Sequence, residues 1–244
     1  MARGPGICNR EMMLVLSHRG YHKKVPENTL EAFEQAIALG VDGIETDVRL
    51  SADGLPVLFH DRLAPDGRPV ASLARDQLNA VVGYPVPTLD SVLERWDNVI
   101  WNVEIKTPAA LDATIPVLRK YQSSRRLLIS SFWHDAIEAV RRHLEVPCGL
   151  LIAHRPASVD QLLALIASPG YGGANSAVRP DSIRAIVWYF EILEQGMLDA
   201  SSEQGMQNFA WGMTSKEEHR QCAELGLDGI ITDHPEFLLQ YSQS

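Results

Sequence analysis

The sequence predicts an α/β fold, a single (β/α)8 TIM barrel with a short β-hairpin insertion after the second strand. Short apolar runs alternate with amphipathic stretches almost from end to end, a pattern that indicates βαβ units and a parallel sheet. Eight of the apolar runs can be parallel strands, the number that a closed barrel requires. The length of 244 residues is close to the ~250 typical of such a barrel. A doubly wound open sheet is the alternative, but the chain lacks a G-x-G-x-x-G turn.

The elements are expected in the following order. The first strand is Leu14–Ser17, and it ends at His18. Asn28, followed three residues later by Glu31, resembles a capping box and opens a helix that stops at Gly40. The other parallel strands are expected at 43–48, 99–105, 127–130, 149–152, 174–178, 208–211 and 229–232. Further amphipathic helices are expected at 109–121, 134–143, 158–167, 181–197 and 215–225.

One strand-like run breaks this alternation. Leu55–Phe59 follows the strand at 43–48 with only the turn Ser51–Gly54 between them, and a parallel crossover needs about a dozen residues. Asp-Gly is also a hairpin signal. We therefore predict that residues 55–60 run antiparallel to the extension of the second strand. His60 would then reach the barrel mouth from above, opposite His18.

The net charge of −9, without any long run of Lys or Arg, argues against a nucleic-acid partner. The three cysteines are far apart and form no C-x-x-C motif, so neither a disulfide framework nor a zinc site is expected. Residues 1–12 do not resemble a signal peptide, and no 18-residue apolar run predicts stable membrane insertion. We expect a cytoplasmic protein with a flexible tail at 1–12 and one domain at 13–244, including an insertion at about 49–88. No pattern in the sequence specifies an oligomeric state.

Acidic side chains gather near the ends of two predicted strands. Side chains alternate along a strand, so Glu45 and Asp47 share one face, and Asn102, Glu104 and Lys106 share one face of their own strand. Both sets lie near carboxyl ends, where barrel active sites are found. Three carboxylates are costly to bury together unless a cation binds them, and all-oxygen ligation indicates Mg²⁺ or Ca²⁺. Surface salt bridges at the strand ends are the simpler alternative.

Two histidines end strands that would face these carboxylates. A single histidine in such a place is more often structural, but His18 and His60 together indicate a general acid and base. Arg19 and Lys106 are then the natural partners for a phosphate. For His22, in the first βα loop, a solvated position is favoured over contact with the substrate.

A set of ordered motifs carries a resemblance to a known family. The motifs are Ser17-His18-Arg19-Gly20, Pro26-Glu27-Asn28-Thr29, Glu45-Thr46-Asp47-Val48, Phe59-His60-Asp61, Glu104-Ile105-Lys106, Ser130-Ser131-Phe132 and Asp228-Gly229-Ile230-Ile231-Thr232-Asp233-His234-Pro235. In this order they resemble the glycerophosphodiester phosphodiesterase family, from about residue 14 to residue 237. The resemblance implies a (β/α)8 barrel with a small insertion after the second strand.

The resemblance also implies a reaction, the metal-dependent hydrolysis of glycerophosphodiesters to glycerol 3-phosphate and an alcohol. The neighbouring glycerol hydroxyl would attack phosphorus, and water would then open the cyclic phosphate. One divalent cation, Mg²⁺ or Ca²⁺, would be needed. The implied roles are metal binding for Glu45, Asp47 and Glu104, acid–base catalysis for His18 and His60, and phosphate binding for Arg19 and Lys106.

Two segments depart from the family pattern. The loop Arg62–Gly67 replaces an Arg-Thr-Thr-rich loop, which leaves the headgroup open, and Trp211-Gly212-Met213-Thr214 replaces W-T-x-N. Trp211 is a candidate substrate-binding residue, and a buried barrel tryptophan is the alternative. Three other functions are weighed: phospholipase D-like cleavage of lysophospholipid or sphingolipid, a non-catalytic barrel that binds phosphate ligands, and a metal-dependent enolising lyase. The pair of histidines beside basic residues favours phosphodiester hydrolysis.

Overall fold

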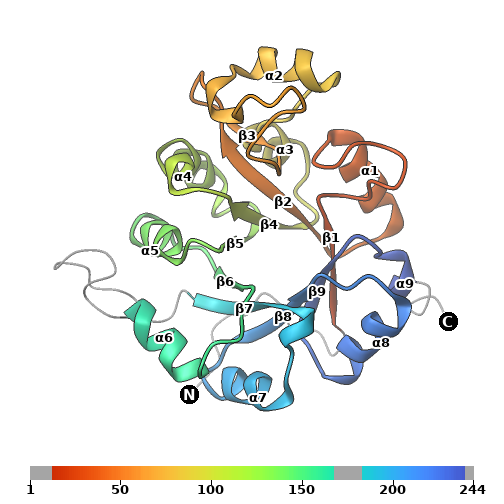
Figure 1. Ribbon diagram of the computed structural model, residues 1–244, viewed down its shortest axis with the longest axis vertical. Coiled ribbons are helices and arrows are strands. Elements are labelled where there is room, and N and C mark those ends of the chain that lie inside the picture. Colours follow the sequence, from red (N-terminus) through yellow and green to blue (C-terminus); the bar gives the residue numbers. More distant parts are fainter. Residues whose placement is uncertain (1–12, 168–182, 240–244) are drawn as a thin grey trace.

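A computed structural model describes residues 13–167 and 183–239. Eight parallel strands form a closed barrel with helices between them (Figure 1), because the sheet order β1-β9-β8-β7-β6-β5-β4-β2 is closed by pairing of β1 with β2. The strands are β1 (Leu14–His18), β2 (Gly43–Leu50), β3 (Pro56–Leu58), β4 (Ile100–Ile105), β5 (Arg126–Ser131), β6 (Cys148–Ile152), β7 (Ile183–Tyr189), β8 (Gln207–Trp211) and β9 (Gly229–Thr232). The predicted fold class is confirmed.

The helices cover the outside of the barrel (Figure 1). They are α1 (Leu30–Leu39), α2 (Arg75–Val82), α3 (Leu89–Arg95), α4 (Leu111–Tyr121), α5 (His134–His143), α6 (Val159–Ala167), α7 (Gln195–Glu203), α8 (Lys216–Glu224) and α9 (Glu236–Leu239), with 3-10 turns at Val70–Ser72, Pro108–Ala110 and Phe190–Ile192. Within the described ranges, none of them is long and apolar enough to cross a membrane.

Two apolar layers result from the alternation of side chains along the strands. Outward residues pack against the helices in the larger core, for example Trp101 and Val103 of β4. Inward residues fill the barrel with a second core: Leu14, Leu16, Ile100, Leu128, Leu151, Ala185, Val187, Phe209 and Ile231. The inward positions nearer the carboxyl ends of β1, β2 and β4 are polar instead. The barrel interior is therefore apolar towards the amino ends of the strands, and one side of the barrel mouth is charged.

The hairpin after β2 is confirmed. β3 runs antiparallel to β2, with Val48 opposite Leu58 and Leu50 opposite Pro56. The chain from β3 through α2 lies beyond one edge of the barrel (Figure 1) and has a small core of its own: Val57, Ala64, Val70, Leu73, Leu78 and Val86. The sequence analysis does not anticipate helices α2 and α3.

The prediction for the sixth barrel strand, β7, needs correction. A helix was expected at 181–197, but Ile183–Tyr189 forms β7 and the helix α7 begins only at Gln195. The strand expected at 174–178 lies outside the described residues. Six of the seven residues of β7 are apolar, and five of the seven are buried, so the run has no polar alternation to mark it as a strand. The tail predicted at 1–12 also lies outside the described residues.

The start of α1 differs in one important detail. The N-cap is Thr29, whose hydroxyl accepts a hydrogen bond from the amide of Ala32. Asn28, expected to be the cap, has a left-handed backbone (φ 54°) and faces the barrel mouth instead. Earlier in the same loop, Gly20 (φ 80°) packs closely on α1. A Cβ atom at this position would lie 2.7 Å from the carbonyl carbon of Ala32.

This close approach generates the first prediction. Gly20→Ala should lower the free energy of unfolding by more than Gly83→Ala, measured by urea denaturation. Both glycines have positive φ, but a Cβ at Gly83 would meet nothing within 4 Å. Gly83→Ala should cost only the left-handed backbone strain of about 1–2 kcal/mol. Gly20→Ala should add about 1–3 kcal/mol of overpacking. Equal losses would contradict the tight packing of the first loop on α1.

Candidate active site

Three buried carboxylates converge at the mouth of the barrel. Glu45 and Asp47 project inward from β2, and Glu104 projects inward from the adjacent strand β4, where it pairs in register with Asp47. One oxygen of each lies within 4.8 Å of the others. The structure thus brings together the three acidic residues that strand alternation selected.

Their mutual repulsion is only partly neutralised. Burial raises the pKa of Glu45 well above its ordinary value, and the charges of Asp47 and Glu104 add to the effect. Burial and Asp47 likewise raise the pKa of Glu104. For Asp47 burial also acts upward, but Lys106 and Arg19 outweigh it and lower the pKa. Oε1 of Glu45 is buried without a hydrogen-bond partner among the described residues. This all-oxygen cluster, with an unpartnered oxygen on Glu45, fits a hard divalent cation.

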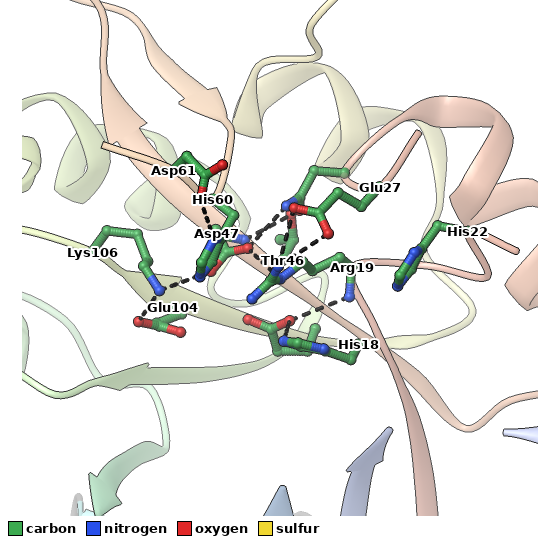
Figure 2. Close-up of polar contacts among 12 residues, drawn as sticks. His18, Arg19, His22, Glu27, Thr46, Asp47, His60, Asp61, Glu104 and Lys106 are labelled. Carbon is green, nitrogen blue, oxygen red and sulfur yellow. Dashed lines mark hydrogen bonds and ion pairs between the residues drawn. The ribbon is translucent and has the colours of Figure 1, made fainter. Parts of the chain in front are cut away.

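Two basic side chains neutralise part of the cluster (Figure 2). Nζ of Lys106 lies 2.8 Å from Oε1 of Glu104 and 3.2 Å from Oδ1 of Asp47. Nε of Arg19 lies 3.0 Å from Oδ2 of Asp47, and its Nη1 donates to both oxygens of Glu27 at 3.0 Å. Arg19 has a left-handed backbone (φ 56°), which turns its side chain back over β2. Both predicted phosphate partners therefore lie at the cluster.

Asn28 fixes the orientation of Asp47, a role that the sequence analysis missed. Its Nδ2 donates to Oδ2 of Asp47 at 2.9 Å. Its Oδ1 accepts from the hydroxyl of Thr46 at 2.6 Å and from the amide of Asp47 at 3.3 Å. The left-handed backbone of Asn28 is common for Asn among non-glycine residues, and it aims the amide at β2. The local pattern with Glu31 suggested a cap because only the folded chain shows Asp47 nearby.

Each predicted catalytic histidine has a carboxylate partner. Nδ1 of His18 donates to Oδ1 of Asp233 at 2.8 Å, and its Nε2 lies 3.8 Å from Oε2 of Glu45. Nδ1 of His60 donates to Oδ1 of Asp61 at 2.9 Å. Burial, reinforced by Arg19 and Lys106, lowers the pKa of His60. In Figure 2, His60 is drawn over Asp47, and His18 lies apart from both.

His22 is a second residue that the sequence analysis misplaced. It was expected to be solvated, but its Nε2 donates to the same oxygen of Asp233 at 3.1 Å. Burial would raise the pKa of Asp233, but the hydrogen bonds from His18 and His22 hold it far below its ordinary value. Asp233 follows β9, and a signal for its role was present only as part of the Thr-Asp-His-Pro motif.

The other side of the mouth is aromatic. Trp211 ends β8 and contacts Tyr189 of β7 and Phe132, which follows β5, with ring centroids 4.8 Å and 5.7 Å apart. Phe132 is 40% exposed, and Trp211 is partly exposed. The sheet order places β8 across the barrel from β4, and β7 across from β2. Tyr189 and Trp211 thus end strands opposite those that carry the carboxylates. Together with Phe132, which follows the strand next to β4, they form an aromatic wall.

Comparison with known proteins points to one family. The sequence model of the glycerophosphoryl diester phosphodiesterase family matches residues 18–237. A glycerophosphodiester phosphodiesterase of Caldanaerobacter subterraneus is 30% identical, over 93% of this chain and 96% of its own. A probable glycerophosphodiester phosphodiesterase of Mycobacterium tuberculosis is 28% identical, over 92% of this chain and 89% of its own.

Solved structures agree on the fold. The glycerophosphodiester phosphodiesterase of Thermotoga maritima superposes with a TM-score of 0.80 at 28% identity, covering 96% of this chain and 100% of its own. A phosphodiesterase of Oleispira antarctica, solved in complex with the product sn-glycerol-3-phosphate, has a TM-score of 0.78 at 21% identity, covering 95% of this chain and 97% of its own.

The contacts of Asn28 generate the second prediction. Asn28→Gly keeps the left-handed backbone accessible but removes the bonds to Thr46 and Asp47, so the free energy of unfolding should fall by about 2–4 kcal/mol. Asn28→Ala should lose a further ~1 kcal/mol or more, because alanine resists positive φ. Chemical denaturation measures both. If Asn28→Gly is as stable as the parent, Asn28 does not hold Asp47.

Proposed function

The chain belongs to the glycerophosphoryl diester phosphodiesterase family, and we propose that it hydrolyses its substrate with one divalent cation and a pair of histidines. It is a phosphoric diester hydrolase that acts on glycerophosphodiesters, the activity for which its relative from Caldanaerobacter subterraneus is named. The proposed products are glycerol 3-phosphate and an alcohol. The observation that carries the mechanism is the convergence of three buried carboxylates near two histidines that each have an acidic partner.

Glu45, Asp47 and Glu104 would hold the cation, either Mg²⁺ or Ca²⁺. The fit rests on three observations: oxygen ligands alone, their mutual proximity, and an oxygen of Glu45 without a partner among the described residues. When bound, such a cation stabilises negative charge on the oxygens of a reacting phosphate. Without one, the raised pKa of Glu45 reflects a charge that the surrounding groups leave uncompensated.

Arg19 and Lys106 would bind the phosphodiester. Both now pair with the carboxylates that form the cation site, Asp47 in particular. A cation at the cluster would compete for those oxygens and leave the two basic groups free to turn to an anionic substrate. Arg19 keeps a second partner in Glu27, so its guanidinium would stay at the site during the exchange.

His18 and His60 would transfer protons through Nε2. In each ring Nδ1 is occupied by a carboxylate, Asp233 or Asp61, which keeps a proton on Nδ1 and leaves Nε2 free. The two rings reach the cluster from separate elements, His18 from β1 and His60 from the segment after β3. This would suit an in-line displacement, in which the attacking and leaving oxygens lie on opposite sides of phosphorus. Asp61 and Asp233 are then positioning residues.

The reaction would proceed in two steps. In the first, the hydroxyl on the neighbouring glycerol carbon attacks phosphorus while one histidine accepts its proton. The other histidine protonates the departing alcohol, and a cyclic glycerol phosphate forms. In the second step, water attacks phosphorus and opens the ring to glycerol 3-phosphate, the molecule with which the Oleispira antarctica enzyme was solved.

Trp211 would bind the part of the substrate beyond the phosphate. Together with Tyr189 and Phe132 it lines the mouth opposite the carboxylates, so a phosphodiester held by Arg19 and Lys106 would extend its alcohol or glycerol towards the aromatic wall. Such a wall accepts groups of varied shape without hydrogen bonds, and this fits the absence of a specific headgroup signal in the Arg62–Gly67 loop.

The product mixture tests this function. With glycerophosphocholine, the protein should release glycerol 3-phosphate and choline, identified by enzymatic assay or by phosphorus NMR. A chelator in excess should abolish turnover, and Mg²⁺ or Ca²⁺ should restore it. Release of glycerol and choline phosphate would show cleavage of the opposite ester bond. Full turnover in excess chelator, by protein free of metal, would refute the cation.

Glu45→Gln separates the cation site from the fold. It should abolish measurable cation binding in calorimetry, while the unfolding temperature of the metal-free protein should hold or rise because a buried like charge is removed. Glu34→Gln is the matched control, since Glu34 is half-exposed on α1 and pairs with Arg95, away from the carboxylate cluster. Its cation affinity should equal that of the parent.

Alanine substitutions test the histidines. His18→Ala and His60→Ala should each lower turnover by at least ~10²-fold, the usual scale for a positioned proton-transfer group. Cation affinity should change little, and His143→Ala, at an exposed site on α5, should leave both unchanged. A p-nitrophenyl ester needs no protonation of its leaving group. It should therefore restore turnover only in the variant that lacks the histidine acting as the general acid. Loss of the cation from either variant would make that histidine a ligand.

A further inference from the structure

A buried amide below the carboxylates has no partner. Asn102 lies on the inward face of β4, between Ile100 of the barrel core and Glu104. It is fully buried and pairs in register with Glu45 of β2. Neither its Oδ1 nor its Nδ2 has a hydrogen-bond partner among the described residues.

A hydroxyl on the next strand is in the same condition. Ser130 projects inward from β5 and pairs in register with Glu104 on one side and with Gly149 of β6 on the other. It too is fully buried, and its Oγ finds no partner in the described part of the chain. Asn102, Ser130 and Oε1 of Glu45 therefore form a floor of unpartnered polar atoms across three neighbouring strands.

The position of this floor separates it from ordinary core packing. Towards the amino ends of the strands the barrel is apolar, with Leu16, Ile100 and Leu128, and Glu45 joins the floor to the carboxylate cluster. Buried polar groups are costly without partners, and proteins usually satisfy such groups with ordered water that makes two to four hydrogen bonds. An amide that accepts and donates, a hydroxyl that does both and a carboxylate oxygen that accepts are suitable partners for one water molecule.

We propose that Asn102 and Ser130 bind a buried water molecule that donates a hydrogen bond to Glu45, and that they position the metal-binding carboxylates through it. The proposal rests on the cation site described above and deepens it. Asn102 does not touch the substrate. It acts on the cation only through Glu45 and the water, in the way that hydrogen bonds to metal ligands orient those ligands in other proteins.

Calorimetric titration of the metal-free protein with Ca²⁺ and Mg²⁺ tests the proposal. Asn102→Leu replaces the amide by an apolar group of similar size, and it should weaken cation binding by about 10–100-fold. Ser130→Ala should weaken binding as well. The double variant should bind no more weakly than Asn102→Leu alone, because both residues act through one water molecule.

Thr114→Val is the matched control. Thr114 on α4 is also fully buried, and its hydroxyl also has no partner among the described residues, but it lies on the helical layer outside the barrel. It should leave cation affinity unchanged. The unfolding temperature of each metal-free variant shows that it is folded, and Ser130→Ala, which removes a single oxygen, carries the test if Asn102→Leu does not fold.

The outcomes are distinct. If the parent protein binds no cation, the proposed cation site and the proposed floor are both wrong. Parent protein that binds a cation, with Asn102→Leu and Ser130→Ala binding equally well, overturns the floor alone and makes Asn102 a packing residue like Thr114. Fully additive losses in the double variant overturn the shared water.

Discussion

The repulsion among three buried carboxylates is the constraint on which the rest of the site depends. Most of the groups that offset this repulsion contact Asp47: it pairs with Arg19 and Lys106 and accepts a hydrogen bond from Asn28. Arg19 and Asn28 are also the only non-glycine residues with positive φ among those described. Backbone strain of this kind persists where the surroundings enforce it, so the shape of the first loop follows from the charge on β2.

The barrel gives these charges a rigid frame, and the hairpin extends the frame upward. The amide of Phe59 donates to the carbonyl of Asp47 at 3.0 Å, and Arg49 of β2 donates to the carbonyl of His60 at 2.7 Å. The strand that carries two of the acidic residues therefore also fixes the backbone that carries His60. A histidine on an independent loop would not keep its distance from the cation site through loop motions. Here two hydrogen bonds to β2 hold the backbone next to His60 beside Asp47.

Much of this could be predicted because β-strands impose a period of two. Alternation alone selected Glu45, Asp47 and Glu104, and the short turn after β2 was enough to predict the antiparallel β3. Alternation failed at Ile183–Tyr189, where both faces are buried and the polar half of the pattern disappears. Asn28 was misread because a local capping pattern competes with a contact to Asp47 that only the folded chain creates. The partners of His18 and the unpartnered amide of Asn102 are likewise properties of packing, which no local pattern encodes.

The two histidine–carboxylate pairs differ in how they depend on the fold. Asp61 is adjacent to His60, so this pair survives as long as the hairpin does. Asp233 lies 215 residues from His18, and it reaches that ring only because β9 pairs with β1 to close the barrel. Opening of that seam would release His18 and His22 together while the carboxylates on β2 and β4 kept their geometry. The structure thus divides the site into a half that needs local structure and a half that needs barrel closure, and the proposed proton transfer would require both.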